Sequence, residues 1–119
     1  MSVRDLLAAS QLGDVEFQRL VNAFVDEFRR ANRGQRQAMI ADGPGQPGKR
    51  EGLIAAAVSA LCREVKLEPP PWVRDIYSPE PFFAFPAHGF ALRLRLMLES
   101  PPPFRARNVF VPEDYLARA

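Results

Sequence analysis

Two stretches of the chain, residues 14–31 and 50–66, repeat apolar residues at the spacing of an α-helix, and this pattern is the strongest constraint on the fold. In the first stretch the apolar positions are three or four residues apart and comprise Phe17, Leu20, Val21, Phe24 and Phe28. In the second stretch they comprise Leu53, Ile54, Ala57, Val58, Leu61 and Val65. A helix with one apolar face must cover that face, so we expect these two helices to pack together.

Prolines divide the rest of the chain into shorter elements. Pro69–Pro71 end the second long helix, because proline lacks an amide N–H and restrains the residue before it. Leucine alternates with arginine in Phe90–Ser100, as in a strand, but Leu, Met and Arg are helix formers and no β-branched residue occurs, so we favour a helix. Shorter helical turns are predicted after Ser2, at 35–41, after Pro71 and after Pro112, and an extended piece at 109–111.

The length of 119 residues fits a single helical domain, with expected bounds 1–119. Residues 42–48 read DGPGQPG, which predicts a flexible loop at about 42–49. The segment Ser78–Pro86 is irregular, and its phenylalanines are expected to pack as a lid over the helices. The predicted fold class is all-α: a small orthogonal helical bundle with a proline- and aromatic-rich C-terminal segment packed across it.

Charge and hydropathy exclude several classes of protein. The net charge of +2 falls short of the dense basic field of a dedicated nucleic-acid binder. No apolar run follows a basic start near the N-terminus, and the longest apolar stretches are far shorter than the roughly 20 residues of a membrane span. We therefore expect a cytoplasmic protein with no membrane partner.

No residue pattern predicts a catalytic, metal or cofactor site. Residues 43–50, GPGQPGKR, match a phosphate-binding loop except at the last position, where Arg50 replaces the metal-binding hydroxyl, and Pro44 and Pro47 remove two backbone donors. The single Cys62 and the single His88 cannot supply a structural zinc site. We interpret residues 43–50 as a linker, Cys62 as a buried apolar residue and His88 as a polar cap or turn residue.

Arginines and aromatic residues gather towards the C-terminus and are the best candidates for binding. Arg93, Arg95, Arg105 and Arg107 are interleaved with phenylalanines, a mixture that can hold anionic groups and stack on flat ones. On a helix, however, Arg93 and Arg95 are about 200° apart and cannot form one patch. The predicted partner-binding residues are Trp72, Phe82, Phe83, Phe104, Arg105, Arg107 and Phe110. The alternative is that these aromatic side chains simply close a small core.

Four segments carry a family resemblance: FVDEFRRA (24–31), RQAMIADGP (36–44), PPWVRD (70–75) and ESPPPFRARNVFV (99–111). They resemble, in the same order, a family of small uncharacterised bacterial proteins from GC-rich genomes. The resemblance implies no established activity, and it assigns no functional residue. Members of that family look as though they are sometimes encoded beside nucleotidyltransferase-like proteins, as an antitoxin would be.

The sequence leads us to expect a non-catalytic protein-interaction module, antitoxin-like or regulatory, that binds another protein and has no cofactor. The alternative is a nucleic-acid-binding transcriptional regulator that uses the C-terminal arginines. A homo-oligomer is a further alternative. An enzyme would need a partner to supply the missing groups.

Overall fold

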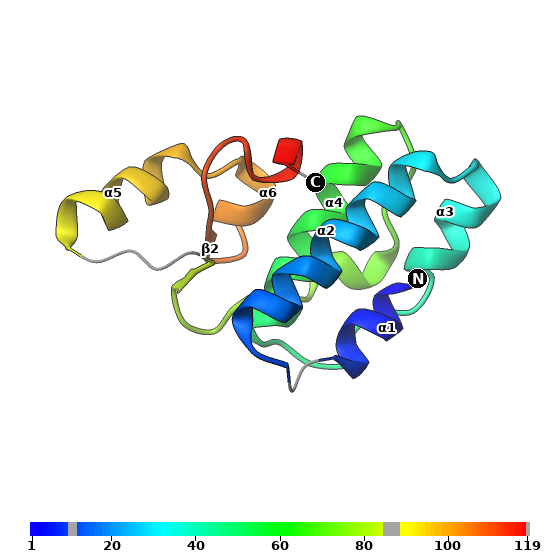
Figure 1. The fold of residues 1–119 in the computed structure, drawn as a ribbon, viewed down its shortest axis with the longest axis horizontal. Coiled ribbons are helices and arrows are strands. Elements are labelled where there is room, and N and C mark those ends of the chain that lie inside the picture. Colours follow the sequence, from blue (N-terminus) through cyan, green and yellow to red (C-terminus); the bar gives the residue numbers. More distant parts are fainter. Residues whose placement is uncertain (10–11, 85–88, 119) are drawn as a thin grey trace.

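The computed structural model describes residues 1–9, 12–84 and 89–118, and most of this chain is helical (Figure 1). The predicted mostly helical class is confirmed. The α-helices are α1 (Val3–Ala8), α2 (Asp14–Arg30), α3 (Arg33–Ile40), α4 (Lys49–Glu64), α5 (Phe90–Glu99) and α6 (Pro102–Arg105). Two 3₁₀ turns, η1 (Pro71–Arg74) and η2 (Tyr115–Arg118), and two short strands, β1 (Phe82–Phe83) and β2 (Val109–Phe110), complete the described chain.

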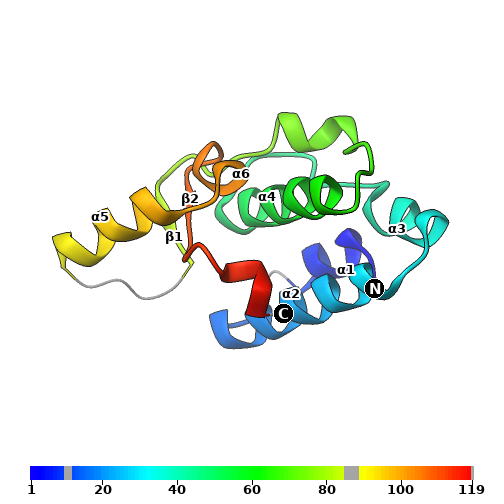
Figure 2. The same cartoon turned by 90° about the horizontal axis from the view of Figure 1, so that it is seen from above.

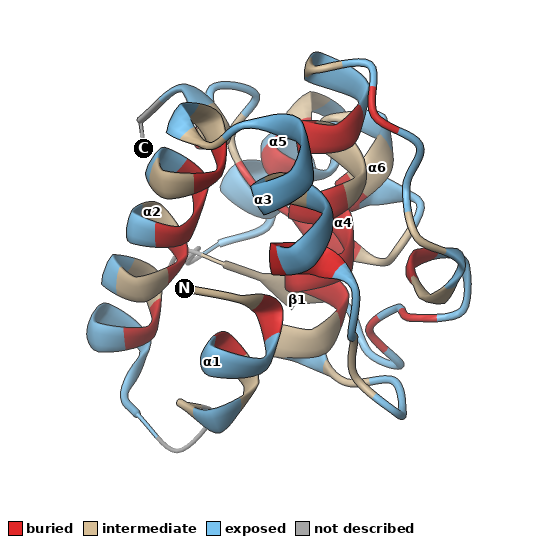
Figure 3. Cartoon of the chain, turned by 90° about the vertical axis from the view of Figure 1, so that its right-hand side faces the viewer, coloured by how far each residue is buried: buried red, intermediate tan, exposed pale blue. Residues whose placement is uncertain are grey.

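The two long helices predicted from the apolar spacing are α2 and α4, and they lie side by side in contact (Figures 1 and 2). Figure 3 shows the buried positions of α2 turned towards α4, and α4 itself is buried along most of its length. A glycine is required at Gly52, because a Cβ there would lie 2.7 Å from the backbone nitrogen of Ser78. The chain after α4 therefore packs directly on the backbone of the central helix.

Side chains cap two of the helices. At α1 the backbone N–H of Ser2 donates to the Asp5 carboxylate over 2.7 Å, which completes a capping box. At α3 the N–H of Gln35 donates to Asn32 Oδ1 over 2.8 Å. Helix α2 has Gly13 as its N-cap and Asp14 as its first helical residue.

The strands β1 and β2 form a parallel pair in which Phe82 is opposite Val109 and Phe83 is opposite Phe110. The extended piece predicted near 109–111 is confirmed by β2, whereas the irregular segment predicted at 78–86 contains β1. Sequence patterns do not reveal this pair, because each strand has two residues and its partner lies far away in the chain. Phe85, Pro86 and His88 lie outside the described residues.

The segment after α5 contributes large side chains to the main core. Phe104 of α6 is completely buried, and its ring meets that of Tyr115 edge-on with the ring centres 5.5 Å apart. The hydroxyl of Tyr115 donates to Gln18 Oε1 of α2 over 2.7 Å. Helix α4 therefore contacts α6 and β2, and helix α2 contacts η2.

Helix α5 differs from the others because it projects from the body of the molecule, on the side away from α3 (Figures 1 and 2). The predicted helix at Phe90–Ser100 is confirmed. Leu96 is the buried residue of α5, and it forms a small separate cluster with Phe110 and the half-buried Phe83. The attachment of α5 to the body therefore uses one side of the helix.

Candidate interaction surface

Three of the aromatic residues predicted to bind a partner lie in the core or pack over it. Phe104 and Phe110 are buried, so neither is accessible to a partner, contrary to the expectation. Trp72 is half-buried, and its Nε1 donates to the backbone oxygen of Ile40 over 2.9 Å. Its ring lies so close to Gly43 that a Cβ there would be 2.1 Å from a ring carbon. The hydrogen bond and the ring contact of Trp72 therefore hold the loop after α3 in place.

Arg107 is also an internal connector. Its Nε and Nη2 donate to the backbone oxygen of Val73 over 3.1 and 2.9 Å, and its Nη1 donates to that of Pro103 over 2.8 Å. Burial lowers the pKa of the Arg107 guanidinium from its ordinary value, because removal from water disfavours the charged form. These bonds join α6 to η1. Arg105, in contrast, is exposed, and its Nη1 lies 3.5 Å from the backbone oxygen of Leu98.

The arginines of α5 have local partners of their own. The guanidinium of Arg93 lies over the ring of Phe83, 5.4 Å from its centre. Nε of Arg95 donates to Glu99 over 2.5 Å, and this hydrogen bond, with the charge of Glu99, raises the pKa of Arg95. The arginines near the C-terminus are thus divided among different partners and do not form one anion-binding patch.

An apolar stripe runs along the outer side of α5. We call it the α5 stripe, and it consists of Phe90, Leu94, Met97 and Leu98. The positions i, i+4, i+7 and i+8 cover an arc of about 100° on a helix. All four side chains are exposed, Phe90 by 81% and Leu98 by 69%, while the buried Leu96 lies on the opposite side of the helix. The stripe therefore faces away from the body of the molecule.

A groove of about 560 Å³ lies between the first half of α2 and β1. We call it the α2–β1 groove, and its lining comprises Asp14, Val15, Gln18, Arg19, Asn22, Phe82, Phe83 and Ala84. Val15 is 67% exposed there. Of the aromatic residues predicted to bind a partner, Phe82 and Phe83 line this groove, and both are half-buried.

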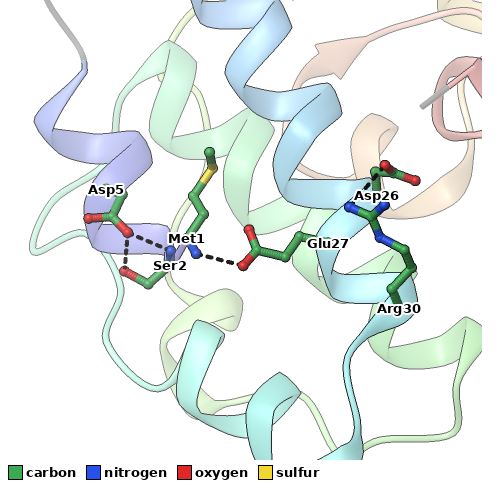
Figure 4. A network of polar contacts seen from close by, with 6 residues as sticks. All are labelled: Met1, Ser2, Asp5, Asp26, Glu27 and Arg30. Atoms are coloured by element: carbon green, nitrogen blue, oxygen red, sulfur yellow. Dashed lines mark hydrogen bonds and ion pairs between the residues drawn. The ribbon is translucent and has the colours of Figure 1, made fainter.

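A second cavity, of about 410 Å³, lies between α2 and α3, and its charged side chains are paired. Glu27 accepts a hydrogen bond from the Met1 ammonium over 2.9 Å, and Arg30 lies 3.3 Å from Asp26 (Figure 4). These ion pairs are partly exposed, and such pairs contribute little to stability. We assign no site to this cavity.

The loop at 43–50 does not present the groups of a phosphate-binding loop. The guanidinium of Arg50 lies over the Phe17 ring, 4.4 Å from its centre, and donates to the backbone oxygen of Leu12 over 2.7 Å. The N–H of Gly48 donates to the backbone oxygen of Tyr77 over 3.1 Å. Both groups are therefore committed to contacts within the chain.

The described part of the chain holds neither a cluster of metal-binding side chains nor a membrane-spanning helix. No group of three or more His, Cys, Asp or Glu side chains that could hold a metal ion occurs among residues 1–9, 12–84 and 89–118. Within the same residues, no helix combines the length and the apolar character that crossing a membrane requires. Burial raises the pKa of the Cys62 thiol to about 11, which keeps it protonated near neutral pH.

Comparison of the chain with protein-family models, with curated proteins and with solved structures finds no match. The accessible surface itself is therefore the basis for a functional proposal. The α5 stripe was missed in the sequence, although a signal was present. The apolar residues of Phe90–Glu99 lie on several sides of the helix, and a single contact with the core cannot cover all of them. Such a distribution indicates that the helix makes a second apolar contact.

Proposed function

We propose that this chain is a non-catalytic protein-interaction module, regulatory or antitoxin-like, that binds another polypeptide chain through the α5 stripe and the neighbouring Phe82 and Phe83. The outward position of the α5 stripe carries this proposal. Contiguous apolar patches on soluble proteins mark contact sites when they are large and helical in spacing. The antitoxin-like role rests only on the resemblance of residues 24–31, 36–44, 70–75 and 99–111 to a family that looks as though it is sometimes encoded beside nucleotidyltransferase-like proteins.

Covering the α5 stripe provides part of the free energy that a specific contact requires. Complete burial of a Leu, Met or Phe side chain contributes about 1.5–3 kcal/mol. The stripe offers four partly exposed side chains of this kind, so covering it contributes on the order of 5 kcal/mol before the costs of association. Phe82 and Phe83, both half-buried, would add further apolar area to the contact.

The proposal includes the remaining expectations from the sequence: a cytoplasmic location, no cofactor, no catalytic activity, and an orthogonal bundle crossed by the C-terminal segment. The burial of Phe104 supports the last of these. Turnover of any substrate by the purified chain alone would contradict the absence of catalytic activity.

Affinity co-purification tests the proposed contact. The wild-type chain, a Leu98→Glu variant and a Tyr77→Glu control are expressed as tagged baits in the native host. Leu98 and Tyr77 are both exposed, and Tyr77 lies outside the α5 stripe and the α2–β1 groove. We expect Leu98→Glu to lose the bound chain and Tyr77→Glu to retain it. Equal recovery by all three baits would refute a contact through α5.

The second candidate function is nucleic-acid binding, and the exposed Arg105 is the observation that favours it. Contacts with phosphate weaken steeply as salt rises, whereas an apolar contact does not. This alternative predicts retention on DNA or RNA that falls with salt and is reduced in Arg105→Ala. We favour protein binding over nucleic-acid binding because the Arg107 guanidinium already donates hydrogen bonds to the backbone oxygens of Val73 and Pro103.

A further inference from the structure

We infer that α5 opens as a separate unit: it detaches from the rest of the molecule and docks again while the core around α2 and α4 stays folded. In the docked state Leu96 of α5 packs on Phe110 and Phe83, and in the open state both rings become accessible. The way in which α5 is held does not depend on what the α5 stripe binds, so this opening stands apart from the proposed function.

One buried side chain attaches α5 through apolar contacts. Leu96 is the buried residue of this helix, and its cluster with Phe110 and Phe83 is separate from the main core. By contrast, α2 has five buried residues and α4 has nine. Because apolar stabilisation is proportional to the area removed from water, docking stabilises α5 far less than packing stabilises α2 and α4.

The boundary between α5 and the core falls at Ser100 and Pro101. The buried hydroxyl of Ser100 donates to the backbone oxygen of Leu96 over 2.6 Å and accepts from the N–H of Val111 over 2.8 Å. Pro101 follows in extended backbone, with φ −57° and ψ 147°, and directs the chain away from the axis of α5. Phe104 and Val111 beyond it are completely buried. The chain is therefore anchored in the core directly after α5.

Helix α5 has little stability of its own. It has ten residues, and helices shorter than about 12–15 residues are marginal in water without tertiary packing. Its N-cap, Gly89, has no side chain to cap the helix, and its first turn carries no acidic residue. Arg93 lies in its N-terminal half and Glu99 is its last residue, so both charges oppose the helix dipole. A detached α5 should therefore lose its helical structure.

The arrangement of the elements allows α5 to open without the core. Helix α5 projects from the body of the molecule (Figures 1 and 2). Helix α6 and strand β2 contact α4, whereas α5 makes no contact as extensive as these with another described element. Its outer side is already exposed, so detachment chiefly exposes Leu96 and the rings beneath it. Opening of α5 should therefore require much less free energy than unfolding of the core.

Native-state hydrogen exchange of the purified chain, measured residue by residue by NMR, tests the inference. The amides of residues 94–99 donate within the helix, and we expect them to be protected to a similar degree. Relative to an unstructured peptide, they should exchange at least about 100-fold faster than the slowest amides of α4. Equal protection of the two helices would overturn the inference. Complete lack of protection in 94–99 would also overturn it, because α5 would then not be docked.

Three variants distinguish separate opening from unfolding of the whole chain. Val25 of α2 is buried in the main core, so Val25→Ala should speed exchange in α4 about tenfold and leave residues 94–99 unchanged. Leu96→Ala should speed exchange in 94–99 at least about tenfold. The matched control is Leu98→Ala on the exposed side of the same helix, which should change it by less than about threefold. Equal acceleration of both helices in Val25→Ala would overturn separate opening.

The reactivity of buried thiols provides an independent measurement. Cys62 in α4 is buried, so its reaction with a water-soluble disulfide reagent reports opening of the core. Leu96→Cys introduces a thiol beneath α5, and this thiol should react at least about 100-fold faster than that of Cys62. Adding Val25→Ala should accelerate the reaction of Cys62 alone. If the introduced thiol reacted no faster than Cys62, α5 would open only with the core and the inference would be overturned.

Discussion

Replacing Arg107 with alanine should destabilise the protein, although the sequence suggested that this arginine binds a partner. The guanidinium donates three hydrogen bonds to two backbone oxygens, those of Val73 and Pro103. A hydrogen bond to a charged group contributes about 1.5–3 kcal/mol, but these three share one side chain and two of them share one acceptor. We therefore expect a loss of about 2–3 kcal/mol in the free energy of unfolding.

The matched control is Arg105→Ala, two residues earlier. Arg105 is exposed and has one contact at 3.5 Å, so its removal should change the free energy of unfolding by less than about 0.5 kcal/mol. Arg107→Lys should fall between the two, because an ammonium keeps the charge but cannot reproduce the planar fork of the guanidinium.

Urea unfolding followed by circular dichroism measures the effect. At the expected loss the melting temperature falls by roughly 10 °C, and the dependence on urea keeps its slope if the variant stays folded. If Arg107→Ala were as stable as Arg105→Ala, the connector role would be refuted, and Arg107 would again be a candidate for partner binding.

Three further predictions concern the core and the loop. Phe104→Ala should cost about 3–5 kcal/mol in urea unfolding, because the side chain is fully buried; a loss below about 1 kcal/mol would contradict its position. Gly43→Ala should shift the fluorescence of Trp72 and lower stability by about 1–3 kcal/mol, since the new methyl group would overlap the ring; unchanged emission would argue against this contact. The Cys62 thiol has a pKa raised by burial from 9.0 to about 11, so its contribution to stability is complete below pH 9 and is lost as the pH rises through 11. In Cys62→Ala the melting temperature should therefore fall less between pH 9 and 11 than in the wild type. The same dependence of melting temperature on pH in both proteins would contradict this role of the thiol.

Much of the helical architecture could be predicted because its signals are local. The spacing of apolar residues in 14–31 and 50–66 places side chains on one face of a helix whatever surrounds it. Pro69–Pro71 end a helix through the missing N–H and steric restraint, which are properties of the chain itself. The structure accordingly has α2 and α4 near those positions, with bounds that differ by a few residues.

The candidate site was less predictable, because composition does not distinguish a buried side chain from an accessible one. Phe104 and Phe83 are both phenylalanines in proline-rich surroundings, yet Phe104 lies in the core and Phe83 lines a groove. Arg107 and Arg105 are two residues apart, and only Arg107 reaches the backbone of Val73. These differences depend on contacts between segments far apart in the chain.

The sequence by itself showed that Phe90–Ser100 is rich in apolar residues, and helix propensity, which is carried by the residues themselves, favoured a helix over a strand there. Only the tertiary structure decided which side of that helix is covered. The pairing of β1 with β2 positions Phe83 and Phe110 beneath Leu96, and this leaves Phe90, Leu94, Met97 and Leu98 on the outside. The physical reason is that burial is a relation between distant parts of the chain, which no local pattern encodes.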